Sequence, residues 1–197
     1  MTNVYDLIAI GAGPAGESAT ELGSFFGYHS AVVEKSRPGG VVTTTGGAPT
    51  KTLREAALYF SGFCKGDVYG LRMSAPPIVA TDIIRKRTLT VCELLQKATA
   101  DNMVKHNVDY IQGTARLGRD GVVAVSGEDG SHRKLHAKTI LIATGSRPSR
   151  PKNISFDIPG VCDTDTILHR GRVPKYILIA GGGAVCHSAS IAATFIR

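Results

Sequence analysis

Residues 5–34, YDLIAIGAGPAGESATELGSFFGYHSAVVE, decide the fold of this 197-residue chain. A continuous apolar run at 7–10 is short enough for a strand buried on both faces. The glycine-rich stretch Gly11-Ala12-Gly13-Pro14-Ala15-Gly16, called the glycine loop below, follows it directly. In a dinucleotide-binding turn, the three glycines permit the tight turn, backbone contact with a pyrophosphate, and close helix–strand packing. The order strand, loop, helix and strand favours such a site over an ordinary glycine-rich α/β turn.

The segment after the glycine loop has the spacing of a helix. Ala15, Ala19, Leu22 and Phe26 recur on one face, which predicts that this face packs on the sheet. Gly27 is a suitable residue for ending the helix.

The start of that helix and the strand after it complete the dinucleotide pattern. Pro14 suits a first helical turn, where its missing N–H is not needed. The free N–H groups and the dipole at the helix start favour an anion. Residues 31–34 predict a second strand, and Glu34 follows Gly16 by 18 residues. That is close to the spacing of about 20 residues at which an acidic side chain meets an adenosine ribose.

The composition describes a soluble globular protein, with 43% hydrophobic and 20% charged residues. The formal net charge is +7, but basic residues are scattered, and Arg85-Lys86-Arg87 is the only tight run. No aromatic residues are interleaved with it, so we interpret it as a solvated helix face and predict no nucleic-acid partner.

Neither a leader nor a membrane anchor is expected. The first apolar segment is too short for a signal peptide and lacks a basic lead. Residues 176–196 are nearly uncharged, but their glycines, serines and His187 indicate a buried strand, turn and helix. The four cysteines are far apart and show no ligand spacing with histidine, so we predict no metal site and a reducing, cytoplasmic location.

The rest of the chain alternates between helical and extended patterns. Residues 38–51 form a glycine- and threonine-rich loop of unusual length, a kind that is often functional. A helix starts near Pro49, which puts Lys51 in its first turn; this lysine is either a solvated surface residue or lies near an anion. We further expect a helix at 81–105 with Thr81 and Asp82 as its cap, a strand at 108–113 and an antiparallel meander at 115–137.

Two later segments repeat the buried-strand pattern. Residues 139–143 predict a parallel strand whose carboxyl end carries Thr144 and Gly145, where ligands of open α/β sheets gather. A proline-rich stretch at 148–159 indicates a linker. Residues 176–180 predict another strand, followed by the glycines 181–183, which resembles the start of a second nucleotide-binding unit.

In this order, the pieces resemble the two-dinucleotide-binding flavoproteins of the pyridine nucleotide-disulfide oxidoreductase family. The most similar branch is the soluble, FAD-dependent (Si-specific) pyridine nucleotide transhydrogenases. The resemblance implies an α/β fold with a Rossmann-like FAD domain at 1–150 that includes the meander, a linker at 151–172 and the opening of an NAD(P) domain at 173–197. It implies FAD as cofactor, NAD(P)H and NAD(P)+ as substrates, and hydride transfer between them through the flavin. Turnover by these 197 residues alone is not expected.

The resemblance also assigns roles to residues. Gly11, Gly13 and Gly16 would hold the pyrophosphate of FAD, Glu34 its ribose, and backbone near Gly113 the adenine. Lys51 would lie beside the reactive edge of the flavin, where a positive charge stabilises the reduced ring. The full set of residues expected at the cofactors is Gly11, Gly13, Pro14, Ala15, Gly16, Glu34, Lys35, Gly40, Thr45, Lys51, Gly113, Thr114, Ala115, Ala143, Thr144, Gly145, Gly181 and Gly183.

This sequence departs from the family pattern at several positions. Disulfide-reducing members carry two cysteines where this chain has Val42 and Gly47. A protein disulfide therefore cannot carry the electrons, and transhydrogenase-like members do not need one. The third glycine of the second loop is replaced or deleted around Cys186, and Ser188 stands where a glutamate is expected. The rest of the NAD(P) domain, the segment that completes the FAD domain and the dimerisation domain of this family are not in these 197 residues.

Other interpretations stay open at this point. The departures also fit a non-catalytic module that binds FAD or an adenine nucleotide. A decayed chain that folds poorly is a further possibility, since a parallel sheet missing a strand exposes an edge that can pair with other chains.

Overall fold

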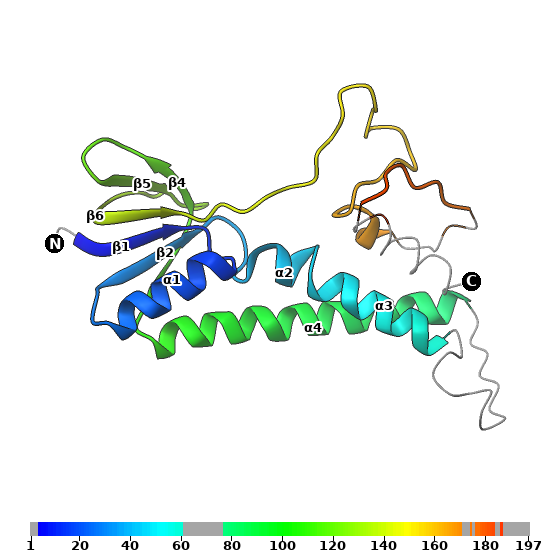
Figure 1. Ribbon diagram of the computed structural model, residues 1–197, viewed down its shortest axis with the longest axis horizontal. Coiled ribbons are helices and arrows are strands. Elements are labelled where there is room, and N and C mark those ends of the chain that lie inside the picture. The colour runs from blue at the N-terminus through cyan, green and yellow to red at the C-terminus, as the bar shows by residue number, and fades with distance from the viewer. Residues whose placement is uncertain (1–3, 61–76, 171–173, 175, 184–185, 187–197) are drawn as a thin grey trace. The chain divides into compact units, whose positions relative to one another are not determined.

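A computed structural model describes residues 4–60, 77–170, 174, 176–183 and 186 of the chain. The chain divides into two compact units, whose residues can be followed by colour in Figure 1. The first comprises residues 1–44 and 93–146, and the second comprises residues 45–92 and 147–197. The division falls within helix α4 (Pro77–Lys105). Each unit is described by itself.

The first unit is built on a six-stranded sheet with the order β3-β2-β1-β6-β5-β4. Strands β1 (Val4–Ile10), β2 (Ser30–Glu34) and β3 (Asp109–Gln112) are parallel and lie next to one another, and β1 also pairs in parallel with β6 (His132–Ile142). All five residues of β2 are buried. A strand covered on both faces needs apolar side chains in both directions, which explains the unbroken apolar run at 31–33. The predicted α/β fold is confirmed.

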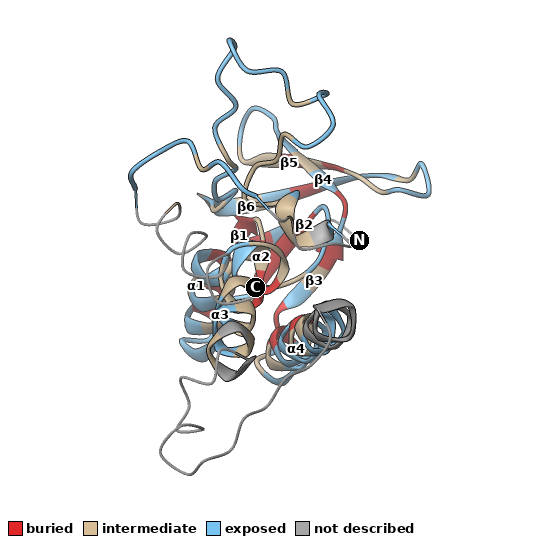
Figure 2. Cartoon of the chain, turned by 90° about the vertical axis from the view of Figure 1, so that its right-hand side faces the viewer, coloured by how far each residue is buried: buried red, intermediate tan, exposed pale blue. Residues whose placement is uncertain are grey.

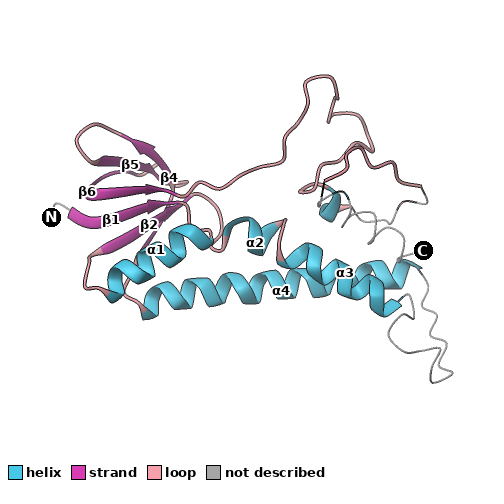
Figure 3. Cartoon of the chain, viewed as in Figure 1, coloured by secondary structure: helices cyan, strands magenta, loops and turns pink. Residues whose placement is uncertain are grey.

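Strand β6 joins two elements that the sequence predicts as separate. Its first residues, 132–136, pair antiparallel with β5 (Val122–Ser126), and residues 136–142 pair in parallel with β1. Strand β4 (Thr114–Leu117) completes the meander by pairing antiparallel with β5. The sequence predicts that the meander ends at 137 and that a separate strand begins at 139, but β6 runs through both without a break (Figure 3). The meander is therefore attached directly to the parallel sheet.

The core of this unit has two clusters, one on each face of the parallel strands. One contains Ile8, Ile10 and Val33 together with Val123 and other meander residues. The other contains Ala9, Val32, Val108 and Met103 of α4. Buried residues are concentrated in these strands (Figure 2). The meander covers one face, and α1 (Pro14–Phe25) and the end of α4 cover the other.

Helix α1 (Pro14–Phe25) packs on the sheet through a different face from the one predicted. Its buried residues are Gly16, Thr20 and Gly23, whereas Leu22 is 57% exposed and Phe26, just after the helix, is 66% exposed. A Cβ at Gly23 would lie 2.8 Å from Ser30 Oγ. The helix comes so close to the strands that only small residues fit between them, and the larger apolar side chains remain outside.

The segment predicted as a long loop is largely helical. Helix α2 (Gly40–Thr44) lies within it, and α3 (Ala48–Phe60) begins at the expected place. Thr43 and Thr44 donate hydroxyl hydrogen bonds to the carbonyl of Gly40, at 3.3 and 2.9 Å, which lets threonine fit into a helical turn. The cap predicted at Thr81 and Asp82 is wrong, because α4 already begins at Pro77, a residue that suits a first turn.

In the second unit, residues 147–170 have one regular element, the 3-10 helix η2 (Ile167–His169). Asp163 organises this segment: its carboxylate accepts two hydrogen bonds from Arg150 (2.7 and 2.8 Å) and one from the hydroxyl of Thr166 (2.7 Å). Three groups lower the pKa of Asp163 to about 2. The hydroxyl of Thr166 has the largest effect, followed by the backbone N–H of Thr166 and then Arg150.

The strand predicted at 176–180 is not formed, and Leu178 is 95% exposed. A parallel strand requires neighbouring strands for its backbone hydrogen bonds. Among the described residues of this unit there is no strand to provide them.

Candidate functional site

The glycine loop sits at the carboxyl ends of β1 and β6. The N–H of Gly11 donates to Val33 O (2.8 Å), and the N–H of Ala143 donates to Ile10 O (2.9 Å). Gly11 has φ +108°, and a Cβ on it would overlap the carbonyl oxygen of Ala143. The first glycine is thus required by the turn and by the neighbouring strand.

Gly16 is also required by packing inside the protein, but Gly13 is not. A Cβ at Gly16 would overlap Gly11 O. At Gly13, with φ −79°, the nearest atom to such a Cβ would be Gly40 Cα at 3.9 Å, which is ordinary contact. Neither the backbone conformation nor the described neighbours of Gly13 therefore demand glycine. The open space beside it fits a group that must touch the backbone, as a pyrophosphate does.

The N-terminus of α1 is ready to receive an anion. Gly13 is its N-cap, Pro14 is the first helical residue, and no side-chain hydrogen bond caps this end. The N–H groups of a first helical turn have no partner within the helix. Together with the helix dipole, they form an anion-binding site directly next to the space at Gly13.

Glu34 is buried at the end of β2 and fixes the glycine loop. Its Oε2 accepts a hydrogen bond from the N–H of Ala12, and its Oε1 accepts one from the N–H of Ser36, both at 2.8 Å. A carboxylate has about four acceptor positions, so two remain for ribose hydroxyls. Burial raises the pKa of the nearby Tyr110, and the charge of Glu34 raises it further. The role of Ala12 and Ser36 could not be predicted from the sequence, because each contributes a backbone N–H, which every residue except proline has.

The remaining predicted residues of this unit lie around the same ends of the strands. The N–H of Gly113 donates to Glu34 O (2.9 Å), and a Cβ there would come within 2.7 Å of Val125 Cγ1. Thr144 and Gly145 follow β6, are exposed, and Gly145 has φ +69° with open space around it. The other predicted residues here are Ala15, Lys35 and Thr114, which are exposed, and Ala115, which is half-buried.

The segment before α2 is anchored on the glycine loop. The N–H of Gly39 donates to Ala12 O (2.7 Å), and a Cβ at Gly40 would lie 3.0 Å from Gly13 Cα. From α4, Gln96 Nε2 donates to Thr43 O (3.1 Å). No sequence signal pointed to Gln96, because its partner is a backbone oxygen 53 residues away.

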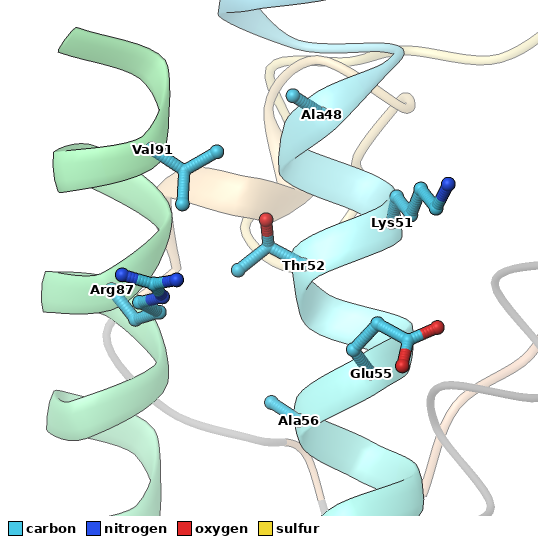
Figure 4. A pocket seen from close by; sticks show the side chains of 7 residues that line it. All are labelled: Ala48, Lys51, Thr52, Glu55, Ala56, Arg87 and Val91. Carbon is cyan, nitrogen blue, oxygen red and sulfur yellow. The ribbon is translucent and has the colours of Figure 1, made fainter. Parts of the chain in front are cut away.

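Lys51, Thr45, Gly181 and Gly183 belong to the second unit. Lys51 lies in the first turn of α3, its N–H donates to Gly47 O (3.1 Å), and its side chain is exposed. It lines an open pocket of about 350 Å³, together with Thr52, Glu55 and others of α3 and α4. Figure 4 shows its side chain pointing away from Arg87, which lies on the facing helix.

Thr45 is half-buried, and the two glycines of the second loop are exposed. Gly181 has φ +136°, and a Cβ on it would lie 2.7 Å from Cys186 Sγ. The serine at 188 lies outside the described residues.

The sequence of this chain matches a known protein family over nearly its whole length. The profile of the pyridine nucleotide-disulphide oxidoreductases matches residues 5–196. The chain belongs to this family. Curated relatives include the soluble pyridine nucleotide transhydrogenases of Mycobacterium tuberculosis (strain ATCC 25177 / H37Ra), 34% identical over 185 residues, and of Pseudomonas fluorescens (strain SBW25), 33% identical over 189 residues. The alignments cover 92% and 95% of this chain, but 39% and 40% of the relatives.

A solved structure with the same fold is that of the HOCl-induced flavoprotein disulfide reductase RclA from Escherichia coli. Its Cu(II) complex superimposes with a TM-score of 0.81 at 26% identity, over 98% of this chain and 41% of that chain. The family resemblance drawn from the glycine loop and Glu34 is thus confirmed, and the chain spans about two fifths of the length of its relatives.

None of the helices that the structure describes is long and apolar enough to cross a membrane. In the same part of the chain, no three or more His, Cys, Asp or Glu side chains gather as metal ligands would.

Proposed function

We propose that this chain is the FAD-binding part of an oxidoreductase that moves hydride between NAD(P)H and NAD(P)+, as in soluble pyridine nucleotide transhydrogenases. The observation that carries the proposal is the open space at Gly13 beside the uncapped N-terminus of α1. In this reading, residues 1–150 are the FAD domain, 151–172 a linker and 173–197 the opening of an NAD(P) domain. A cytoplasmic location is part of the same proposal; a homodimer is typical of the family, but the domain that forms it is not in these 197 residues.

The residues of the first unit would divide the work of holding FAD. The backbone at Gly13 and the first turn of α1 would bind the pyrophosphate, and the free acceptor positions of Glu34 would bind the ribose. Gly113 to Ala115 would lie at the adenine, and Thr144 and Gly145 along the cofactor. When bound, FAD supplies a site that accepts hydride from one nicotinamide and returns it to another.

Two features of the chain define the remaining chemistry. Lys51 would place a positive charge near the flavin and stabilise its reduced form. Val42 and Gly47 have no sulfur, so electrons would not pass through a disulfide of this loop. Hydride transfer between two nicotinamides through the flavin is a reaction that needs no such disulfide.

A second candidate is a non-catalytic module that binds FAD or an adenine nucleotide. The observation that favours it is the exposed course of residues 176–183, which do not form the strand and turn of a nicotinamide site. The module would use the same glycine loop and Glu34 but would not be reduced by NADH or NADPH.

The visible spectrum after gel filtration, with and without added FAD, tests the proposal. A flavin band that travels with the protein, and that bleaches when NADH or NADPH is added without oxygen, supports the oxidoreductase. A colourless protein that still binds AMP supports the module. Loss of both flavin and AMP binding contradicts the use of the glycine loop in this chain.

A further inference from the structure

A second concave site lies in the first unit, between α1, α2 and the part of α4 after residue 92. It is an open pocket of about 380 Å³, within the range of about 300–1,000 Å³ typical of small-ligand sites. Its walls include Val42 of α2 and Leu95 and Ala98 of α4. Val42 is 45% exposed and Leu95 is 39% exposed, so these apolar side chains are incompletely covered by protein.

One end of the pocket is acidic. Glu17 of α1, Thr99 and Asn102 line it, and the hydroxyl of Thr99 donates to Glu17 Oε2 at 3.4 Å. Asn102 Nδ2 donates to Oε1 of Glu21, one helical turn from Glu17, at 2.7 Å. Burial raises the pKa of Glu17, and the charge of Glu21 raises it further.

The partners of these two carboxylates are neutral. No ion pair formed by the described residues includes Glu17 or Glu21, although the chain carries a formal net charge of +7. Burial and a neighbouring carboxylate disfavour the charged form of a carboxyl group, and a cation within about 4–6 Å favours it. The pocket therefore combines uncovered apolar walls with an acidic end that lacks a positive partner.

We propose that this pocket binds a planar apolar ring that carries a cationic nitrogen, such as an aryl amidinium. The ring would cover Val42, Leu95 and Ala98, which removes their apolar surface from water. The cationic nitrogen would donate to Glu17, whose charged acceptor gives a stronger hydrogen bond than a neutral one. The pocket adjoins the proposed FAD site through Pro14, but the proposed contacts are to Val42, Leu95, Ala98 and Glu17 and need neither FAD nor a nicotinamide, so the inference can be tested without cofactor.

Benzamidine is the probe, titrated into the full 197-residue chain labelled with ¹⁵N. The expected result is that amide signals of residues 14–17, 42–43 and 95–102 shift with one saturable curve. Benzyl alcohol, with the same ring and no charge, is expected to bind about tenfold more weakly or not at all. Equal affinity for the two rings, or shifts confined to other residues, would overturn the proposal.

Two variants and one control locate the contact. Glu17→Gln keeps the shape of the side chain and removes its charge. Because burial disfavours that charge, the variant should fold. It should bind benzamidine about tenfold more weakly than the wild type does. Ala98→Phe, at an exposed helical position, fills the pocket and should abolish binding. Asp101→Asn removes the same charge from an exposed site on α4 outside the pocket and should change affinity less than about twofold. Unchanged affinity in either Glu17→Gln or Ala98→Phe refutes the assigned site.

Discussion

Alanine substitutions at Gly13 and Gly16 should separate binding of the nucleotide from folding. Both are Gly→Ala changes three residues apart in one loop, so their chemistry is matched. A Cβ at Gly13 would have its nearest neighbour at 3.9 Å, whereas one at Gly16 would overlap the carbonyl oxygen of Gly11. We expect Gly13→Ala to fold and lose its ligand, and Gly16→Ala to lose its fold.

The magnitudes follow from the local geometry. At Gly13, φ −79° suits any L-residue, and alanine restricts the unfolded chain, which stabilises the protein by about 0.4–1 kcal/mol. Alanine is a poorer N-cap than glycine, which costs roughly 0.5–1 kcal/mol. These two effects offset each other, so the free energy of unfolding should change by less than about 1 kcal/mol. At Gly16 the added Cβ would overlap backbone, which cannot move aside as a flexible side chain can, and relieving the overlap should cost roughly 3 kcal/mol.

Urea unfolding followed by circular dichroism gives the two free energies, and titration with FAD and with ADP-ribose gives the affinities. For Gly13→Ala, we expect the affinity for both ligands to fall about tenfold or more, since its methyl group would stand where the pyrophosphate touches the backbone. If folded Gly13→Ala binds both ligands as the wild type does, the phosphate does not lie at Gly13. If instead it unfolds as readily as Gly16→Ala, the space beside Gly13 is needed by the protein itself.

Three further outcomes are expected. Glu34→Gln should destabilise the chain by about 1–3 kcal/mol in urea unfolding, because a side-chain NH₂ would face one of two backbone N–H groups. Burial, and to a smaller extent the hydrogen bond to Asp109, raises the pKa of Tyr5 from 10.0 to about 12. The stability that the neutral Tyr5 contributes is therefore complete below pH 10 and is lost as the pH rises through 12. In an absorbance titration at 295 nm, Asp109→Asn should lower the pKa of Tyr5 from about 12 only part of the way to 10.0, because the effect of burial remains. Thr166→Val should raise the pKa of Asp163 from about 2 toward 3.8 in an NMR titration; the stability from this carboxylate is present above pH 3.8 and is lost as the pH falls through 2.

The sequence was sufficient for the parts of the fold that depend on local patterns. Short apolar runs predicted β1 and β2, and the glycine loop with Glu34 predicted the family that the profile match confirmed. These signals are readable because a buried strand and a tight glycine turn each constrain residue type at nearby positions. The positions of the first turn of α1 and of Glu34 follow from the same patterns.

The errors arose where distant parts of the chain decide the outcome. The apolar spacing at Leu22 and Phe26 predicted the buried face of α1, but close packing on the sheet selected Gly16, Thr20 and Gly23 instead. Hydrophobic periodicity assumes that large residues fill the space between helix and sheet, and here that space is too narrow. The failed strand at 176–180 has a related cause, since a strand depends on neighbours that its own residues do not supply.

The segment of residues 39–44 is held in place by contacts that do not involve sulfur. The N–H of Gly39 still bonds to Ala12 O, and Gln96 still holds the backbone of Thr43. Through these bonds, α2 keeps Gly40 against Gly13, the residue whose open side fits a pyrophosphate. None of these contacts uses a side chain at 42 or 47. The contacts that hold this segment therefore do not depend on thiols at these positions, and this is the physical reason to expect that a nucleotide site can form here without a disulfide.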